Sequence, residues 1–282
     1  MILKNTIKNA SLLLKNSFIK SHLLDAEIII SNIMNVKREF LLLNDDMMIS
    51  KSIISKYNDA IKRRLKKEPV AYIVGKKEFW SIDFPVDKAT LIPRPETELL
   101  VHEVTEFYKN KKINILDMGT GSGCILLSIL KELGSSRGIG IDISAKAIAI
   151  ARINSKRLDL MNRSKFMVFN LDKFNIGKFD LVISNPPYIP SKDIKNLSRD
   201  ITNYEPRVAL DGGLDGLDLI KKVIYKSNHL LKKNGLLALE IGYNQYRRVS
   251  SMLKYSGYRE MSRECDYNHN VRCIMSTKVK FF

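Results

Sequence analysis

The stretch "INILDMGTGSGCILLSILKELG", residues 113–134, decides the fold of this 282-residue chain. It begins with an apolar run of the length of a buried strand and ends with helical apolar spacing that stops at Gly134. Three glycines, Gly119, Gly121 and Gly123, lie between the two parts. A strand, a glycine loop and a helix in this order are typical of the first unit of a parallel α/β sheet.

The same alternation continues outward from this stretch. Further strands are expected at 138–144, 165–172, 179–185 and 235–242, and helices at 146–158 and 216–235. Residues 262–278 contain two short strands joined by a turn, which fits an antiparallel hairpin at a sheet edge. The sequence therefore predicts an α/β domain over residues 93–282, with a mostly parallel seven-stranded sheet and an antiparallel edge hairpin.

The first part of the chain differs in character. Residues 1–75 have helical apolar spacing, with Gly absent before Gly75 and Pro absent before Pro69, so we expect a small helical domain. Residues 76–92 alternate apolar and polar side chains, as a β-hairpin or an extended linker does. No apolar run approaches the ~18 residues of a membrane helix, and none near the start suits a secretory signal.

The cysteine content points to a reducing compartment. The chain has three cysteines, Cys124, Cys265 and Cys273, too few and too sparse for a disulfide framework. Cys265 and Cys273 flank His269 at a regular spacing, but no further metal ligand lies nearby, so no metal site is expected. We expect a cytoplasmic protein that does not associate with membranes.

The formal charge of +17 is spread along the chain rather than gathered in a tail. Lys outnumbers Arg by 32 to 15, which is typical of a compositional bias across the whole chain. The charge is therefore weak evidence for a nucleic-acid partner, although a positive potential speeds encounter with any acidic surface.

The glycine loop excludes two common ligand classes. A nicotinamide fingerprint requires Gly where this chain has Cys124, and a phosphate-binding P-loop requires a G-K-[ST] sequence. Two carboxylates bracket the loop: Asp117 ends the first strand, and Asp142 lies nineteen residues after Gly123, where an acid usually accepts hydrogen bonds from ribose hydroxyls. S-adenosylmethionine fits these parts, because it has a ribose and a cationic end and lacks phosphate.

The stretch "SNPPYIP", residues 184–190, places Asn185 at the carboxyl end of a strand, where open α/β sheets bind ligands. We expect the Asn185 side-chain oxygen and the Pro186 carbonyl to accept both N–H bonds of an amino group on a planar carrier. Pro187 restricts the backbone, and Tyr188 offers a face for stacking. The pattern predicts methyl transfer to nitrogen; adenine, cytosine, guanine and glutamine amides all remain open as acceptors.

Five longer motifs extend over most of the chain. They are "EPVAYIVGKKEFW" (68–80), "LIPRPETELLV" (91–101), "NPPYIP" (185–190), "YEPRVALDGGLDGLD" (204–218) and "LEIGYNQ" (239–245). With them, the chain resembles the N5-glutamine methyltransferases that modify peptide-chain release factors. This resemblance implies a Rossmann-like class I methyltransferase domain, a helical domain that helps hold the protein substrate, and the glutamine of a Gly-Gly-Gln motif as the methyl acceptor.

The resemblance also implies roles for individual residues. S-adenosylmethionine would be held by Gly119, Thr120, Gly121, Ser122, Gly123, Asp142 and Asn185. Near the adenine, Asp172 matches the family's acid, Lys173 stands where an aromatic residue is usual, and Phe174 would take over the stacking. The catalytic and glutamine-binding set would be Asn185, Pro186, Pro187 and Tyr188, with Arg94, Thr97 and Glu98 lining the cleft.

Three alternatives remain open. A sibling enzyme would methylate a glutamine of a ribosomal protein, and a DNA or RNA amino-methyltransferase would share the Asn-Pro-Pro-Tyr motif. A binding module without catalysis is the third. The expected partner is a release factor, with no requirement for nucleic acid, and we expect a monomer. Labelled S-adenosylmethionine supplied with either release factor or DNA discriminates between a release-factor methyltransferase and a DNA methyltransferase.

Overall fold

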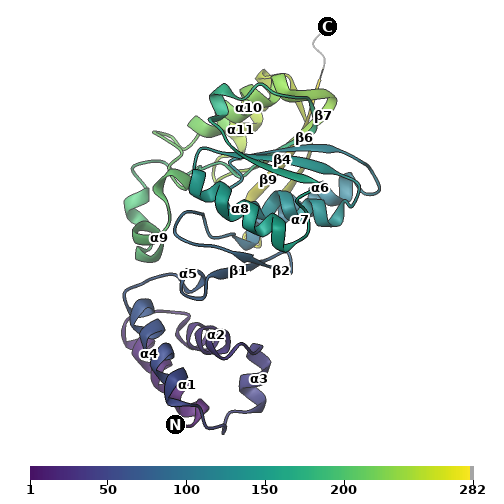
Figure 1. Cartoon of the computed structure of the whole chain (residues 1–282). Coiled ribbons are helices and arrows are strands. Elements are labelled where there is room, and N and C mark those ends of the chain that lie inside the picture. The colour runs from purple at the N-terminus through teal and green to yellow at the C-terminus, as the bar shows by residue number, and fades with distance from the viewer. Residues whose placement is uncertain (280–282) are drawn as a thin grey trace. The chain divides into compact units, whose positions relative to one another are not determined.

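The computed structural model describes residues 1–279 and divides the chain into two compact units (Figure 1). One unit consists of Met1–Lys76 together with Ser198–Tyr204. The other consists of Lys77–Leu197 and the chain from Glu205 onward. The boundary expected at residue 75 lies next to the first of these junctions, whereas the return of 198–204 to the helical unit was not anticipated.

The helical unit contains six helices, of which the first five pack around an apolar core and the last adds no buried residue to it. They are α1 (Leu3–Asn16), α2 (His22–Met34), α3 (Arg38–Leu43), α4 (Lys51–Leu65), α5 (Val70–Val74) and α9 (Arg199–Tyr204). Leu14, Ile30 and Tyr57 are fully buried in this core, and the Tyr57 hydroxyl donates to the Ala26 carbonyl at 3.1 Å. The predicted helical character of the N-terminal residues is thus confirmed.

The other unit is built on a seven-stranded sheet preceded by a separate hairpin, β1 (Lys76–Phe79) and β2 (Ile82–Pro85). The strand order is β5-β4-β3-β6-β7-β9-β8, with β9 antiparallel to both of its neighbours. The strands are β3 (Asn114–Met118), β4 (Arg137–Asp142), β5 (Ser164–Val168), β6 (Phe179–Ser184), β7 (Leu231–Glu240), β8 (Tyr258–Cys265) and β9 (Val271–Lys278). This confirms the mostly parallel sheet with an antiparallel edge hairpin.

Helices cover both faces of the sheet (Figure 1). On one face lie α6 (Glu98–Phe107), α7 (Cys124–Glu132) and α8 (Ala145–Arg157), and on the other lie α10 (Asp218–Leu230) and α11 (Tyr246–Tyr255). Ile115 packs into the first layer and its neighbour Leu116 into the second, because successive strand residues point to opposite faces. The strands are therefore apolar on both sides, as a buried parallel sheet requires.

One helix boundary differs from the prediction. The helix expected to run to Gly235 ends at Leu230, and β7 begins at once with Leu231, which pairs with Phe179. The register then shifts, and Leu236 pairs with Leu181. The leucines of this irregular part of β7 pack in the sheet, yet they continue the helical spacing of the apolar residues before them. Periodicity alone therefore could not locate the end of the helix.

The topology creates a crevice at one edge of the sheet. After β3 the chain forms β4 on one side of β3, and later it forms β6 on the other side of β3. Such a reversal of strand order leaves room between the connections at the carboxyl ends of the strands, which is where open α/β sheets bind ligands. Among the helices of residues 1–279, none has the length and apolar character needed to cross a membrane.

Candidate active site

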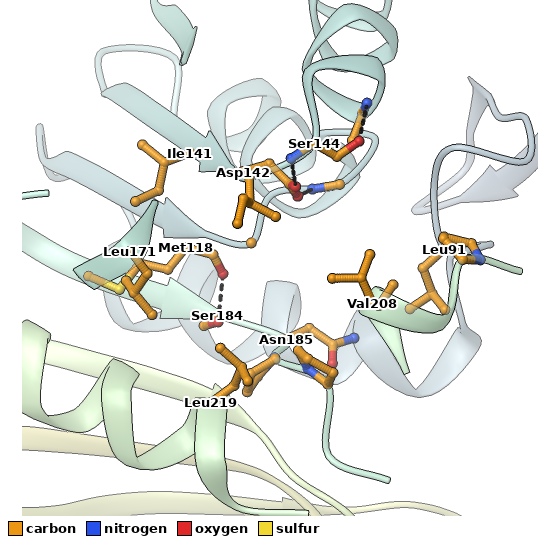
Figure 2. A pocket seen from close by; sticks show the side chains of 18 of the residues that line it. Leu91, Met118, Ile141, Asp142, Ser144, Leu171, Ser184, Asn185, Val208 and Leu219 are labelled. Atoms are coloured by element: carbon orange, nitrogen blue, oxygen red, sulfur yellow. Dashed lines mark hydrogen bonds between the residues drawn. The ribbon is translucent and has the colours of Figure 1, made fainter. Parts of the chain in front are cut away.

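A cavity of about 550 Å³ lies at the carboxyl ends of β3, β4 and β6 (Figure 2). Gly119 and Gly121 line it after β3, Asp142 at the end of β4, and Asn185 and Pro186 after β6. Its volume is in the range of pockets that enclose small organic ligands. The two motifs that the sequence singled out independently, the glycine loop and Asn-Pro-Pro-Tyr, thus share one cavity.

The glycine loop exposes its backbone to this cavity. Gly119 and Gly121 have φ values of +75° and +55°, which side chains rarely tolerate, and a Cβ at either position would meet no atom within 4 Å. Gly123 opens α7, where a Cβ would lie 3.0 Å from the Phe166 ring. The first two glycines therefore leave room for a ligand, whereas Gly123 permits close packing of the helix. Thr120, Ser122 and Gly123 do not line the cavity.

Asp142 is held by the backbone on both sides of the crevice. Its Oδ2 accepts the Gly121 N–H at 3.0 Å and its Oδ1 accepts the Ser144 N–H at 2.9 Å, as Figure 2 shows. The side chain is only partly buried. Because each carboxylate oxygen can accept more than one hydrogen bond, Asp142 retains acceptor capacity for ligand hydroxyls.

Asp117 lies beneath the glycine loop rather than in the cavity wall. It is fully buried and accepts the Thr120 hydroxyl at 2.5 Å on Oδ2. Within residues 1–279 its Oδ1 has no hydrogen-bond partner. Burial without full hydrogen bonding disfavours the charged form and raises the pKa of Asp117 to about 7.

The wall near η2 (Leu171–Lys173) departs from the expected stacking arrangement. Asp172 lines the cavity and pairs with Lys222 of α10 at 2.7 Å, but Lys173 does not line it. Phe174 is fully buried and contacts Phe169 edge to face, with ring centroids 5.3 Å apart. A buried Phe174 cannot stack on a ligand. Two other apolar residues, Phe169 and Leu171, line the cavity at this position.

Asn185 presents its side-chain oxygen as an available acceptor. Its Nδ2 donates to the Thr97 hydroxyl at 3.1 Å, which accounts for the amide nitrogen. Neither the Asn185 Oδ1 nor the Pro186 carbonyl accepts a hydrogen bond from any residue in the described range. Asn185, Pro186 and Pro187 all line the cavity, so the site has the two acceptors that the motif predicted.

Tyr188 lies behind this loop and does not line the cavity. Its hydroxyl accepts a hydrogen bond from Arg272 at 2.9 Å and donates to Glu240 Oε1 at 3.3 Å. The Arg272 guanidinium also lies over the ring, 5.4 Å from its centroid. One face of the ring is thus occupied, and burial raises the pKa of the Tyr188 hydroxyl.

Arg94 and Glu98 join segments of the chain and do not line the cavity. Arg94 pairs with the buried carboxylate of Glu205 at 2.5 Å, and Glu205 also accepts the Ile92 N–H at 3.1 Å. Glu98 accepts the Trp80 N–H at 2.9 Å. The cavity is instead lined by Val208 and by three residues that precede Arg94 in the chain, Ala89, Thr90 and Leu91 (Figure 2).

Gln245 is a buried residue whose role was not predicted, although it stands in the "LEIGYNQ" motif. Its Nε2 donates to the carbonyls of Tyr188 and Gly216, each at 3.0 Å, and its Oε1 accepts the Gly242 N–H at 2.8 Å. One side chain thereby joins three loops at the carboxyl edge of the sheet. These hydrogen bonds connect the motifs at 185–190, 204–218 and 239–245 in space.

Comparison of the sequence with known protein families gives two matches. Residues 5–75 match the family described as "PrmC N-terminal domain", and residues 109–280 match "Methyltransferase domain". The release factor glutamine methyltransferase of Caulobacter vibrioides is 38% identical, over 94% of this chain and 92% of that protein. The enzyme of the same name from Clostridium acetobutylicum is 36% identical over 99% of both chains.

Solved structures agree with the fold. A ribosomal protein L11 methylase from Lactobacillus delbrueckii aligns with a TM-score of 0.51 and 17% identity, over 66% of this chain and 81% of that one. A methyltransferase from Pyrococcus furiosus aligns with a TM-score of 0.53 and 13% identity, over 79% of this chain and 100% of that one. At these identities the likeness concerns the architecture.

Proposed function

Because the chain belongs to the family of release factor glutamine methyltransferases, we propose that it methylates the N5 amide nitrogen of the glutamine in the Gly-Gly-Gln motif of peptide-chain release factors. It is an S-adenosylmethionine-dependent methyltransferase. The observation that carries the proposal is the shared cavity, in which an open glycine loop and Asp142 face the two available acceptors at Asn185 and Pro186.

The residues present fit S-adenosylmethionine. The positive-φ glycines Gly119 and Gly121 leave space along the backbone, and Asp142 has free acceptor capacity for the ribose hydroxyls. Asp117 lies beneath the loop with a buried Oδ1 that has no partner within residues 1–279 and a pKa that burial raises to about 7; a cationic ligand end close to it would favour its charged form. When bound, the group supplies an electrophilic methyl carbon on a sulfonium.

The acceptor amide is held by the loop after β6. A carboxamide nitrogen is a weak nucleophile because its lone pair is delocalised into the carbonyl. Asn185 Oδ1 and the Pro186 carbonyl can accept its two N–H bonds, which orients the nitrogen and stabilises the positive charge that develops on it during transfer. The Pro186 and Pro187 rings fix the loop backbone and bring no N–H donor that would compete for these acceptors.

The rim of the cavity suits entry of a side chain from a protein loop. Leu91 and Val208 lie at one end of the cavity, and Val208 is well exposed (Figure 2). Arg207 and Asp211, from the same segment as Val208, also line the cavity, so its rim combines apolar and charged side chains. The buried Glu205 carboxylate binds Arg94 and the Ile92 N–H, and thereby stabilises the rim that carries these residues. In this proposal Arg94, Thr97 and Glu98 shape the site without touching the glutamine.

The proposal includes a monomeric enzyme that needs no nucleic acid and acts in the cytoplasm. The three cysteines are free, which suits a reducing compartment. Light scattering of the purified protein and activity after nuclease treatment test the first two points.

The test is transfer of label from methyl-labelled S-adenosylmethionine to purified release factor. Label should appear on the release factor and disappear when the glutamine of its Gly-Gly-Gln motif is replaced by alanine. A ribosomal protein mixture and duplex DNA serve as competing acceptors in parallel reactions. Labelling of either competitor but not of release factor would refute the proposal and identify the substrate class instead.

A further inference from the structure

The loop that carries the two acceptors, Asn185–Tyr188, is poor in backbone hydrogen-bond donors. Pro186 and Pro187 have no N–H, so these two residues cannot attach the loop to a neighbouring segment through backbone donors. Their carbonyl groups remain available as acceptors and as surfaces for packing. The groups that hold this backbone come from outside the loop, from Gly212, Gly216 and Gln245.

Gln245 supplies the donor for the Tyr188 carbonyl. It lies directly before α11 and is 4% exposed. One N–H of its Nε2 group donates to the Tyr188 carbonyl at 3.0 Å, and the other donates to the Gly216 carbonyl at 3.0 Å. Its Oε1 accepts the Gly242 N–H at 2.8 Å. Because both donors and the acceptor of the amide are engaged, the side chain is held in one orientation.

The two glycines bring a second segment of the chain against the same backbone. A Cβ at Gly216 would lie 2.4 Å from the Tyr188 carbonyl oxygen, and a Cβ at Gly212 would lie 2.7 Å from that of Pro187. The φ of Gly216 is +76°, which favours glycine in itself. Gly212 is not among the residues with positive φ, so the close approach of the Pro187 carbonyl accounts for its lack of a side chain.

These contacts restrict the carbonyl that the methyl-accepting amide needs. The ring of Pro187 holds φ at about −65°, and the peptide bonds on either side of it are planar. Between the carbonyls of Pro186 and Pro187, only ψ of Pro187 can therefore vary. Since the Pro187 oxygen packs against Gly212 and the Tyr188 oxygen is bonded to Gln245, the Pro186 carbonyl has little freedom to turn.

We propose that Gln245 is a positioning residue for methyl transfer, which together with Gly212 and Gly216 holds the Asn185–Tyr188 loop in the place that the reaction requires. None of the three lines the cavity, so they act through the loop. The inference rests on the proposed function for its kinetic consequence. Its structural consequence, a loop immobilised by Gln245, does not depend on the identity of the substrate.

The principal test is Gln245→Met, which keeps the length of the side chain and removes its three hydrogen bonds. We expect kcat to fall by about 10- to 100-fold, the loss typical of misplaced reacting groups. The Kd for S-adenosylmethionine should stay within about threefold of wild type (~0.7 kcal/mol), because Gly119, Gly121 and Asp142 lie on other segments. A folded Gln245→Met protein with the kcat of wild type would overturn the proposal.

Gly212→Ala tests the packing without removal of a hydrogen bond. The added methyl group has to displace the Pro187 carbonyl, so kcat should again fall while the cofactor Kd stays within about threefold. The matched control is Gly134→Ala, at a glycine that also lacks positive φ and where a Cβ would meet no atom within 4 Å. Gly134→Ala should keep the wild-type kcat, and equal rates in both variants would contradict the proposal.

A double-mutant cycle separates positioning from general damage. In the Asn185→Ala background one of the two acceptors on the loop is already missing, so Gln245→Met should lower kcat by a clearly smaller factor than in wild type. Effects that simply multiply would assign Gln245 a role in stability alone and would overturn the proposal.

Asn228 provides a control for the loss of a side-chain amide. Its Nδ2 donates to the Ser256 carbonyl at 2.6 Å, close to the ends of α10 and α11 and away from the cavity. Asn228→Leu should lower the melting temperature and keep the wild-type kcat. A loss of kcat that follows the melting temperature equally in Asn228→Leu and Gln245→Met would also overturn the proposal.

Hydrogen exchange distinguishes failure of this inference from failure of the proposed function. The Ile189 N–H donates to the Leu210 carbonyl at 3.1 Å, and the Gly212 N–H donates to the Ile189 carbonyl at 2.9 Å. Exchange of both amides should become roughly tenfold faster in Gln245→Met and stay unchanged in Asn228→Leu. Unchanged exchange in Gln245→Met would overturn the inference even if release factor is methylated. Faster exchange would support it even if the wild-type protein methylates a different substrate.

Discussion

Replacement of Asp142 by alanine should weaken cofactor binding far more than replacement of Asp172, although both carboxylates line the same cavity. Asp142 is fixed by two backbone N–H groups at 3.0 and 2.9 Å, so its free lone pairs are already oriented before a ligand arrives. Loss of a hydrogen bond to such a charged acceptor costs about 1.5–3 kcal/mol. The Kd for S-adenosylmethionine should rise roughly 10- to 150-fold.

Asp172 is the internal comparison. Its side chain is 49% exposed and paired with Lys222 at 2.7 Å. An exposed carboxylate of this kind contributes about 0–1 kcal/mol, so Asp172→Ala should change Kd by less than about fivefold. Asp142→Asn should resemble Asp142→Ala, because its NH2 group would face one of the two backbone N–H donors instead of accepting from it.

Isothermal titration calorimetry with S-adenosylmethionine measures all three variants, and thermal melts establish that each is folded. An Asp142→Ala protein that melts normally and binds the cofactor as wild type does would refute the assignment of Asp142. A larger effect at Asp172 than at Asp142 would refute the reasoning from preorganisation, since it would assign the main contact to the exposed carboxylate.

Three other changes test separate parts of the site. Asn185→Ala should lower kcat by ~10²–10³, the usual loss for a transition-state hydrogen bond in a dry site, with cofactor Kd within about tenfold in calorimetry. Burial raises the pKa of Asp117 from 3.8 to about 7, so between these pH values the native state keeps a proton that the unfolded chain releases. The free energy of unfolding should therefore fall as pH rises from about 3.8 to about 7, and Asp117→Asn should make the melting temperature less dependent on pH over this range. If the charge of +17 speeds encounter with an acidic protein, kcat/KM for release factor should fall with added salt while kcat stays constant in steady-state assays.

Much of the site could be predicted because its parts follow strands. Asp142 ends a parallel strand and Gly119 and Asn185 each directly follow one, and the carboxyl ends of parallel strands share one edge of a sheet. Their convergence on one cavity therefore followed from local patterns and one topological rule. The residue types then restricted the ligand, because the loop has neither the third glycine of a nicotinamide fingerprint nor the lysine of a P-loop.

The contacts that were missed join residues far apart in the chain. Arg94 reaches Glu205 and Asn185 reaches Thr97, pairings that no local periodicity can indicate. Burial also decided between two phenylalanines: Phe174 was needed in the core, which left Phe169 to line the cavity. The motif alone predicted that Arg94 lines the cleft, whereas its ion pair with the buried Glu205 carboxylate joins two distant segments of the chain.

The membership of α9 in the helical unit has a consequence for biosynthesis. Residues 1–76 leave the ribosome first, but the helix that completes their unit follows only after Lys77–Leu197 have been made. The contact of the Tyr204 hydroxyl with the Lys66 carbonyl at 3.0 Å thus cannot form early in translation. Only the packing of α9 must therefore wait until part of the other unit has been made, because α9 adds no buried residue to the apolar core that α1 to α5 form.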